Sequence, residues 1–384
     1  MSYLRPLDVA SSRPLLHERG RPAETKLLGL ELVRFVCAFA VLVWHYQHFY
    51  SIIGAPAFNP SAQPLHALLE PFYRYGMFGV QIFWGISGFI FFWKYGQAIA
   101  DLRVGGAKFF WLRLSRLYPL HFATLLLVAS LQPIHVALTG HSFVYQGNDA
   151  PNFVAQLFMA THWGRPTPFT FNGPIWSVSA EVFVYALFFL LVRRFGAGWG
   201  TIAGTIAATL AAMTAGFASP VLLCASYFFV GGAAARLFLE RQLAGRTSTL
   251  VPLSLGALAL IAIGSRLGGV TLTEQNIVLL LLAATPPLLL LAAQDWQLLG
   301  RWPQTIQAVG NLTYSTYLIH FPMQLLVAVA CAATGLVLPV QSPLLLVVYL
   351  VATIAIGRWL FLRLERPAQN WIRRQTLAPR PAAA

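Results

Sequence analysis

The chain has 384 residues, of which 57% are hydrophobic, 14% are aromatic and only 10% are charged. Soluble domains carry about a quarter charged residues, so this composition excludes an ordinary soluble protein and indicates an integral membrane protein. The formal net charge of +14 does not indicate a nucleic-acid partner, because the sequence contains no compact basic module with interleaved aromatic residues.

Apolar segments long enough to span a bilayer, separated by polar breaks, predict an all-α polytopic membrane protein with about ten transmembrane helices. The membrane domain covers 27–366, between a disordered cytosolic tail at 1–26 and a second cytosolic tail at 367–384. The apolar segment 152–163 is short, so we interpret it as interfacial or re-entrant. In chain order, the predicted spans are 27–49, 75–97, 110–131, 174–192, 198–218, 220–239, 249–267, 275–293, 305–331 and 343–363.

Lysine and arginine residues are distributed unevenly between the two sides of this predicted topology. Arg34 lies within the first span, and only Arg74, Arg165 and Arg266 fall on the side opposite the N-terminus. By the positive-inside rule, with an even number of spans, both termini lie in the cytosol. The net charge therefore reflects topology, and its natural contact is the anionic headgroups of the lipid bilayer.

The first predicted span contains two ionisable residues, Arg34 and His45, in the segment RFVCAFAVLVWH. Their offset is nearly three helical turns, so both side chains lie on one helix face, about 16 Å apart along the axis. Ionisable groups within a membrane span are costly and usually functional. We interpret the pair as the lining of a polar path. The alternative is a snorkelling arginine and an unrelated buried histidine.

The third predicted span begins with the basic segment KFFWLRLSRLYPL. Arg113 and Arg116 are three residues apart and share a helix face, and Lys108 precedes them. Guanidinium groups near a helix N-terminus combine bidentate donors with the positive end of the helix dipole, which suits a phosphate group. The alternative is ordinary anchoring by the positive-inside rule.

The fourth predicted span contains the carboxylate that we place deepest in the membrane, Glu181, in the segment NGPIWSVSAEVFVYALFFL. Glu181 lies about 10 Å from the external end of this helix, and Ser177 is one turn earlier on the same face. His45 also falls near the outer leaflet, so we expect imidazole and carboxylate at matching depth, as a general base and its orienting partner require. The alternative is a single helix–helix hydrogen bond.

Two further segments supply polar side chains at similar depth. Ser87 lies beside two glycines in GVQIFWGISGFIFFW, and Tyr314, Tyr317 and His320 form a stripe in NLTYSTYLIHFPM. Each alone is typical of helix packing, but together they predict a polar cavity. His48 follows His45 by three residues, but no third ligand of suitable type lies nearby, so we predict no metal site.

Six motifs, taken in order, resemble those of the integral membrane acyltransferase family 3, which includes bacterial O-antigen, exopolysaccharide and Nod-factor O-acetyltransferases. The resemblance covers nearly the whole membrane region, and we expect no C-terminal esterase-like domain of the kind that some relatives carry. Gln81, Val182 and His121 depart from the residues usual at these positions, which are Asp, Glu and Tyr. The motifs are RFVCAFAVLVWH, GVQIFWGISGF, RLSRLYP, WSVSAEVFVY, YSTYLIHFP and LERPAQNW.

The resemblance implies transfer of an acyl group, commonly acetyl, from cytosolic acyl-CoA to a glycan hydroxyl at the bacterial inner membrane. The acceptor would be an extracytoplasmic or lipid-linked glycan such as exopolysaccharide, O-antigen of lipopolysaccharide, or an oligosaccharide. Acetyl-CoA is then a substrate, and no bound cofactor is expected. The implied site residues are catalytic His45, Glu181 and Arg34, acyl-CoA-binding Arg113, Arg116 and Lys108, and Ser87, Ser177, Tyr314 and His320 around the cavity, oxyanion or acceptor.

The sequence is compatible with two mechanisms and three functions. Transfer can be direct, with His45 as general base and Glu181 orienting it, or covalent, through His45 or a serine. The same cavity could serve a transporter or flippase for a lipid-linked saccharide, or the chain could be a non-catalytic partner in polysaccharide assembly. The lack of a clear internal repeat argues against a transporter built from inverted repeats. A requirement for acyl-CoA separates the enzyme from the flippase.

Overall fold

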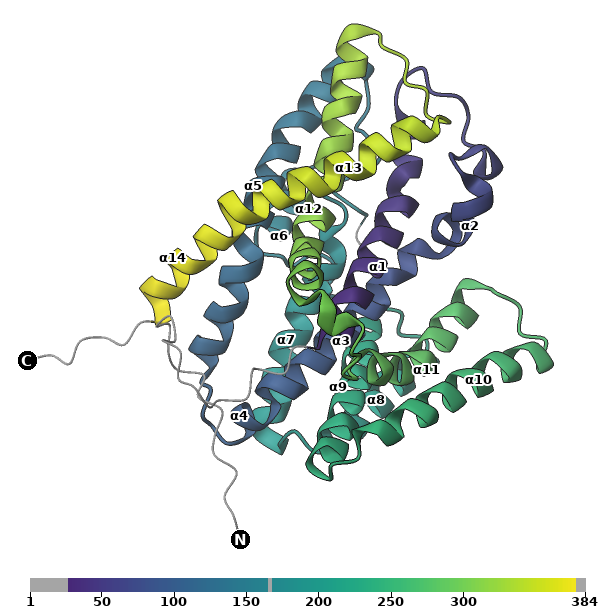
Figure 1. The fold of residues 1–384 in the computed structure, drawn as a ribbon. Helices are drawn as coiled ribbons and strands as arrows, with labels where there is room; N and C mark the ends of the chain where they lie inside the picture. The colour runs from purple at the N-terminus through teal and green to yellow at the C-terminus, as the bar shows by residue number, and fades with distance from the viewer. Residues whose placement is uncertain (1–26, 165–167, 378–384) are drawn as a thin grey trace, which may run out of the picture.

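The computed structural model describes residues 27–164 and 168–377 (Figure 1). Within these ranges all regular secondary structure is helical, and nine helical segments are long and apolar enough to cross a membrane. The predicted class, an all-α polytopic membrane protein, is therefore confirmed. The predicted N-terminal tail, 1–26, and Arg165 lie outside the described residues.

The helices range from single turns to spans of more than thirty residues, and short 3₁₀ or π-helical turns connect several of them. In chain order they are α1 (Leu28–His45), α2 (His66–Tyr75), α3 (Gly79–Phe91), α4 (Gln97–Ala100), α5 (Gly106–Thr139), α6 (Ala150–Leu157), α7 (Ile175–Phe195), α8 (Trp199–Thr214), α9 (Pro220–Leu243), α10 (Leu250–Leu267), α11 (Glu274–Ala292), α12 (Pro303–Thr334), α13 (Pro343–Leu360) and α14 (Arg366–Leu377).

Nine of the ten predicted spans correspond to helical segments of spanning length, and several are longer than expected. The third, predicted at 110–131, extends over Gly106–Thr139. The fifth, predicted at 198–218, is α8, which has 16 residues and is therefore about 24 Å long. A hydrocarbon core is about 30 Å thick, so this helix is shorter than a full crossing.

The apolar segment 152–163 contains the short helix α6 and the turn that follows it. His121 of α5 donates through Nε2 to the backbone carbonyl of Gln156, at 2.7 Å. The buried Gln156 side chain donates to the Thr170 carbonyl, at 2.6 Å. These bonds fix α6 and the loop after it against α5, and they give His121, one of the departures from the family motif, a structural contact.

Helices α3 and α9 approach each other backbone to backbone at glycine residues. A Cβ atom on Gly88 would collide with the carbonyl oxygen of Phe228, and one on Gly231 would collide with that of Gly85. Small residues at helix crossings permit such contact within membranes, where packing and not hydrophobic exclusion holds helices together. Gly85 and Gly88, the two glycines beside Ser87, thus lie at the crossing of α3 and α9.

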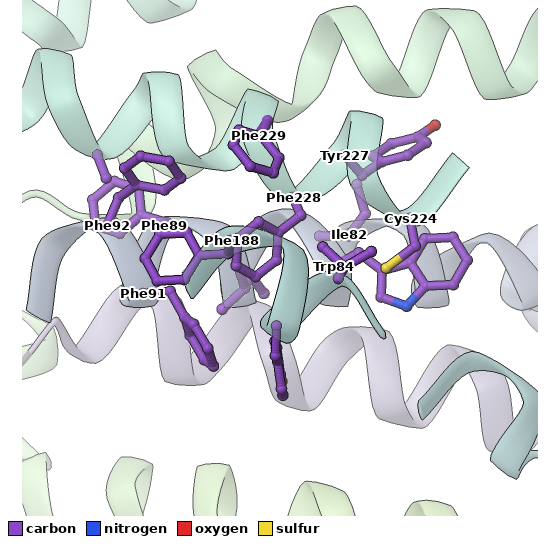
Figure 2. Packing of buried hydrophobic residues seen from close by; sticks show 14 of the residues in the cluster. Ile82, Trp84, Phe89, Phe91, Phe92, Phe188, Cys224, Tyr227, Phe228 and Phe229 are labelled. Atoms are coloured by element: carbon purple, nitrogen blue, oxygen red, sulfur yellow. The ribbon is translucent and has the colours of Figure 1, made fainter. Parts of the chain in front are cut away.

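An aromatic cluster fills the space between α3, α7 and α9 (Figure 2). The ring of Phe91 stacks on that of Tyr185 with centroids 4.3 Å apart, and it meets Phe188 and Phe228 edge-on at 5.6 and 5.4 Å. Each such aromatic pair stabilises the fold by about 0.5–1.5 kcal/mol in addition to the effect of burying its apolar surface. Phe91 and Tyr185 also line a cavity, so this cluster forms one of its walls.

Helices α13 and α14 form one nearly continuous rod, joined by the π-helical turn Phe361–Glu365 (yellow in Figure 1). The side chain of Ser315 in α12 donates to Glu365 in this turn, at 2.6 Å. We expected a tail from residue 367 onward. Helix α14 instead packs against α5, so the residues up to Leu377 belong to the helical body.

Candidate active site

A cavity of about 380 Å³ lies between α1, α3, α5, α7, α12 and α14. This volume is in the range of small-molecule binding sites. Five cationic side chains line it, against two carboxylates, so the cavity suits an anionic ligand. The cations are Arg34, Lys94, Arg113, Arg116 and Arg373, and the carboxylates are Glu31 and Glu181.

Arg113 is held in a fixed orientation at this cavity. Its Nη2 donates to the hydroxyl of Tyr95 at 2.7 Å, and its guanidinium lies 4.8 Å from the ring centre of Phe91. Its Nε is buried and has no hydrogen-bond partner among the described residues. A planar guanidinium that is held in one orientation at a cavity suits bidentate binding of a phosphate group.

Two π-helical turns carry residues at or beside the cavity. Phe92–Gly96, directly after α3, supplies Lys94 and Tyr95 to its lining. Phe361–Glu365 supplies the buried Glu365, which interacts electrostatically with Arg116 and Arg34. Single π-helical turns within α-helices occur frequently at functional sites, because the extra residue redirects the side chains around it.

Glu181 lies in α7, as predicted, and it faces the cavity. The hydroxyl of Tyr185 donates to its Oε1 at 2.6 Å, and Ser87 hydrogen-bonds it as well. The cations with which it interacts are Arg34 and Arg113. Glu181 therefore shares the cavity lining with Arg34 and Arg113 and interacts electrostatically with both.

His45, the last residue of α1, is oriented by its own helix. Its Nδ1 donates to the backbone carbonyl of Val41 at 2.8 Å. A carbonyl can only accept, so Nδ1 carries the proton, and in the neutral imidazole Nε2 keeps its lone pair. The prediction that Glu181 orients this imidazole is therefore wrong. The Val41 carbonyl orients the imidazole instead, and Glu181 accepts a hydrogen bond from Tyr185.

Three histidines lie together next to the end of α1. The ring of His45 is 4.5 Å from that of His320 and 5.0 Å from that of His48, centroid to centroid. Gln324 joins them, because its amide donates to the backbone carbonyl of His45 at 2.9 Å and its Oε1 pairs with His48 Nδ1 at 3.1 Å. His48 is buried in this group. Within the described ranges, no group of three His, Cys, Asp or Glu residues has metal-binding geometry.

Tyr317 contacts both the cavity and the histidines. Its hydroxyl donates to the Pro174 carbonyl at 2.9 Å and lies 2.7 Å from Ser177 Oγ, and both Tyr317 and Ser177 line the cavity. Its ring is 5.9 Å from that of His320. Tyr314, one turn earlier, donates its hydroxyl proton to the Leu117 carbonyl at 2.6 Å, which leaves no proton for a substrate oxygen.

The cavity brings together most of the predicted site residues, but not all of them. His45, His320 and Lys108 do not line it, and His45 and His320 form the histidine group just described. Sequence reasoning missed Tyr185, although it lies one helical turn after Glu181, and Glu31, which pairs with Arg34 at 3.0 Å. Those predicted residues that do line the cavity are Arg34, Ser87, Arg113, Arg116, Ser177, Glu181 and Tyr314.

The fold and this cavity define a polytopic membrane protein with a cation-rich cavity. A sequence model of the acyltransferase domain of family 3 matches residues 27–362, which is most of the chain. The chain therefore belongs to acyltransferase family 3, the family expected from its motifs, and it is a membrane acyltransferase. The match ends before α14 begins. Searches among curated proteins and solved structures returned no significant match.

Proposed function

We propose that the protein transfers an acyl group, in the simplest case acetyl, from cytosolic acyl-CoA to a hydroxyl of an extracytoplasmic or lipid-linked glycan. The glycan would be an exopolysaccharide, an O-antigen or an oligosaccharide. The observation that carries this proposal is the cation-rich cavity in a chain that belongs to an acyltransferase family. Coenzyme A carries several phosphate groups, and guanidinium groups bind phosphate oxygens in bidentate geometry. Arg113 and Arg116 are the predicted phosphate ligands that line the cavity.

The proposed location is a bacterial inner membrane, with both termini and the cation-rich cavity on the cytosolic side. The cations that line the cavity come from near the beginning of α1, the turn directly after α3, near the beginning of α5, and α14. With an N-terminus in the cytosol, each of these helix ends is cytosolic. The excess of Lys and Arg on this side supports the same orientation.

In the proposed reaction, Nε2 of His45 removes the proton from the acceptor hydroxyl as its oxygen attacks the thioester carbonyl. The C–S bond then breaks, the acyl group stays on the oxygen, and the imidazolium returns the proton to the leaving thiolate. The Nδ1 bond to Val41 supports this role, because it leaves Nε2 as the basic atom. Arg34 or Ser87, both in the cavity lining, would stabilise the oxyanion.

In this scheme the donor enters along the cations and its acyl end reaches Tyr317 and Ser177. Along α12, Thr313, Tyr314 and Tyr317 line the cavity, and His320 follows one turn later beside His45. The acceptor hydroxyl would approach from the side of the histidine group. Glu181 would serve electrostatically, by holding the guanidinium groups of Arg34 and Arg113 in place.

Deletion cells complemented with variants test this function. We expect proton NMR of surface glycans to show loss of O-acetyl signals on deletion and their return with the wild-type chain. His45→Ala should lower transfer about 10²–10⁴-fold, the usual contribution of a general base. His141→Ala is the matched control, because this histidine is exposed on the loop after α5.

Three results would contradict the proposal at different points. Full restoration of O-acetylation by His45→Ala, at matched membrane levels, would remove His45 from the mechanism. A glycan that keeps its acetyl groups but fails to reach the surface would favour the transporter. In proteoliposomes, acceptor modification that proceeds without added acetyl-CoA would exclude acyl-CoA as the donor.

A further inference from the structure

Arg373 contributes a cation to the cavity from outside the segment that the family model matches. The family match ends at residue 362, whereas Arg373 lies in α14. Its side chain crosses to α5, where Nε donates to Ser115 Oγ at 3.2 Å and Nη2 approaches the Leu112 carbonyl at 3.5 Å. It is half-buried and lines the cavity.

The guanidinium groups of Arg113, Arg116 and Arg373 line the same cavity. Arg373 lies close enough to Arg113 and Arg116 for like charges to interact. Within the ranges that the structure describes, none of the three is in an ion pair. Like charges that are partly removed from water repel each other, and an anion bound among them would relieve this repulsion. Departures of this kind from the most stable arrangement are typical of binding sites.

The contacts of Arg373 orient it without using all of its donors. A guanidinium has five N–H groups in a fixed planar fork. Ser115 and Leu112 account for two of them, which leaves three for a ligand. Ser115 itself donates to the Leu112 carbonyl at 3.3 Å, so its oxygen accepts from Arg373 in a defined direction.

We propose that Arg373 binds phosphate of the donor and that α14 thereby completes the acyl-CoA site. This inference rests on the function proposed above. Coenzyme A carries a diphosphate and a phosphate monoester, and a monoester alone has about two negative charges near neutral pH. Arg373 is then a specificity-determining residue, which favours a donor with a phosphorylated nucleotide end over a short acyl thioester.

Arg374, the next residue in α14, provides a matched control for a substitution of Arg373. Arg374 has the same charge and lies on the same helix, but its side chain is exposed and does not line the cavity. It faces a separate surface groove with Trp371 and Asn370. Arg374→Met therefore removes one positive charge from α14 without changing the cavity, whereas Arg373→Met removes one from inside it.

The test measures binding of CoA to the purified full-length protein in detergent. We expect Arg373→Met to weaken CoA binding about tenfold to a hundredfold, as for loss of one charge-assisted contact with phosphate. Arg374→Met should bind as the wild type does, and Arg373→Lys should fall between the two, because it keeps the charge and loses the fork. Added salt should weaken binding less steeply in Arg373→Met than in the wild type.

Thermal unfolding without ligand separates binding from structure. Arg373→Met should unfold near the wild-type temperature, because the contact with Ser115 lies at a half-buried position. Unchanged CoA affinity in Arg373→Met would overturn the inference. An equal loss of CoA affinity in Arg374→Met would also overturn it. So would a loss of affinity in Arg373→Met that is fully explained by a smaller folded fraction of that variant. A wild-type chain that binds no CoA would instead refute the proposed function itself.

Discussion

Glu181 is a charged side chain inside the membrane domain, and its neighbours define what its charge can do. Tyr185 and Ser87 hydrogen-bond it, and Arg34 and Arg113 are the cations around it. Removing this carboxylate takes away one negative charge near Arg34 and Arg113, while Glu31 still pairs with Arg34 and Tyr95 still accepts a hydrogen bond from Arg113. In the proposed mechanism its effect on transfer is therefore electrostatic, without contact with His45.

Glu181→Gln isolates the charge, because glutamine has nearly the same size and can still accept from Tyr185. We expect kcat to fall about tenfold to a hundredfold, since the positioned charges around the reacting carbonyl are disturbed. O-acetyl content of glycans, measured by NMR in complemented deletion cells, reports the change. Glu274→Gln, at the exposed beginning of α11, is the control. Wild-type activity in Glu181→Gln would show that the charge has no function.

The close crossing of α3 and α9 determines where the cavity wall lies. Gly88 faces the backbone of Phe228, and Gly231 faces the backbone of Gly85, so neither helix can move closer or take a side chain at this point. Ser87 and Phe91 lie on the same stretch of α3 and reach the cavity. The glycines thus act on the site indirectly, through the position of the helix.

Gly88→Ala should destabilise the protein, because the new Cβ would meet the Phe228 carbonyl oxygen and force the helices apart. Overpacking of this kind costs about 1–3 kcal/mol, so we expect a clear fall in the unfolding temperature in detergent. Unfolding can be followed with a thiol-reactive dye, because all three cysteines are buried.

The control for this prediction is Gly256→Ala in α10, where a Cβ would meet no heavy atom within 4 Å. Alanine favours helix over glycine by about 1 kcal/mol, so this variant should be unchanged or slightly more stable. Equal unfolding temperatures of Gly88→Ala and Gly256→Ala would contradict the prediction, because α3 and α9 would then accommodate the added Cβ without loss of stability.

The two π-helical turns each direct a side chain toward a residue on another helix. Phe92–Gly96 turns Tyr95 toward Arg113, and Phe361–Glu365 turns Glu365 toward Ser315. The second turn also sets the direction in which α14 leaves α13. Because α14 carries Arg373, the orientation of this helix bears directly on the proposed donor site.

At the scale of the whole molecule, the proposed topology can be tested with engineered cysteines. Ser61 and Ser248 are both exposed, and the proposed topology places them on opposite sides of the membrane. A membrane-impermeant thiol reagent should label Ser61→Cys in intact cells with a permeable outer membrane. It should label Ser248→Cys only after the inner membrane is opened. The native cysteines are buried, so the unmodified chain is the background control. The opposite labelling pattern would place the cation-rich cavity outside the cytosol.

Most features that depend on a short stretch of sequence could be predicted. Hydropathy identified an all-α membrane protein, because each span must be apolar along its own length. Positions on one helix were also predictable, such as Ser177 and Glu181 on α7, because the helical repeat fixes which residues share a face. The segment 198–218 was predicted less well, since composition does not reveal that α8 has only 16 residues.

Partners on different helices could not be predicted in this way. Matching depth suggested that His45 and Glu181 meet, but depth does not specify which faces of two helices turn toward each other. The structure pairs His45 with Val41 and Glu181 with Tyr185, and it turns α1 so that Arg34 enters the cavity. Arg373 gave no local signal, because its place beside Arg113 follows only from the packing of α14 on α5.

The sequence by itself therefore determined the class of protein, its family and the residue types available for chemistry. Hydropathy, helical periodicity and motif order are properties of short stretches, which are readable without a fold. Only the tertiary structure decided which of these residues form the cavity and which lie beside it in the histidine group. Those contacts join residues far apart in the chain, and they depend on helix packing, in which a single glycine such as Gly88 sets the distance between two backbones.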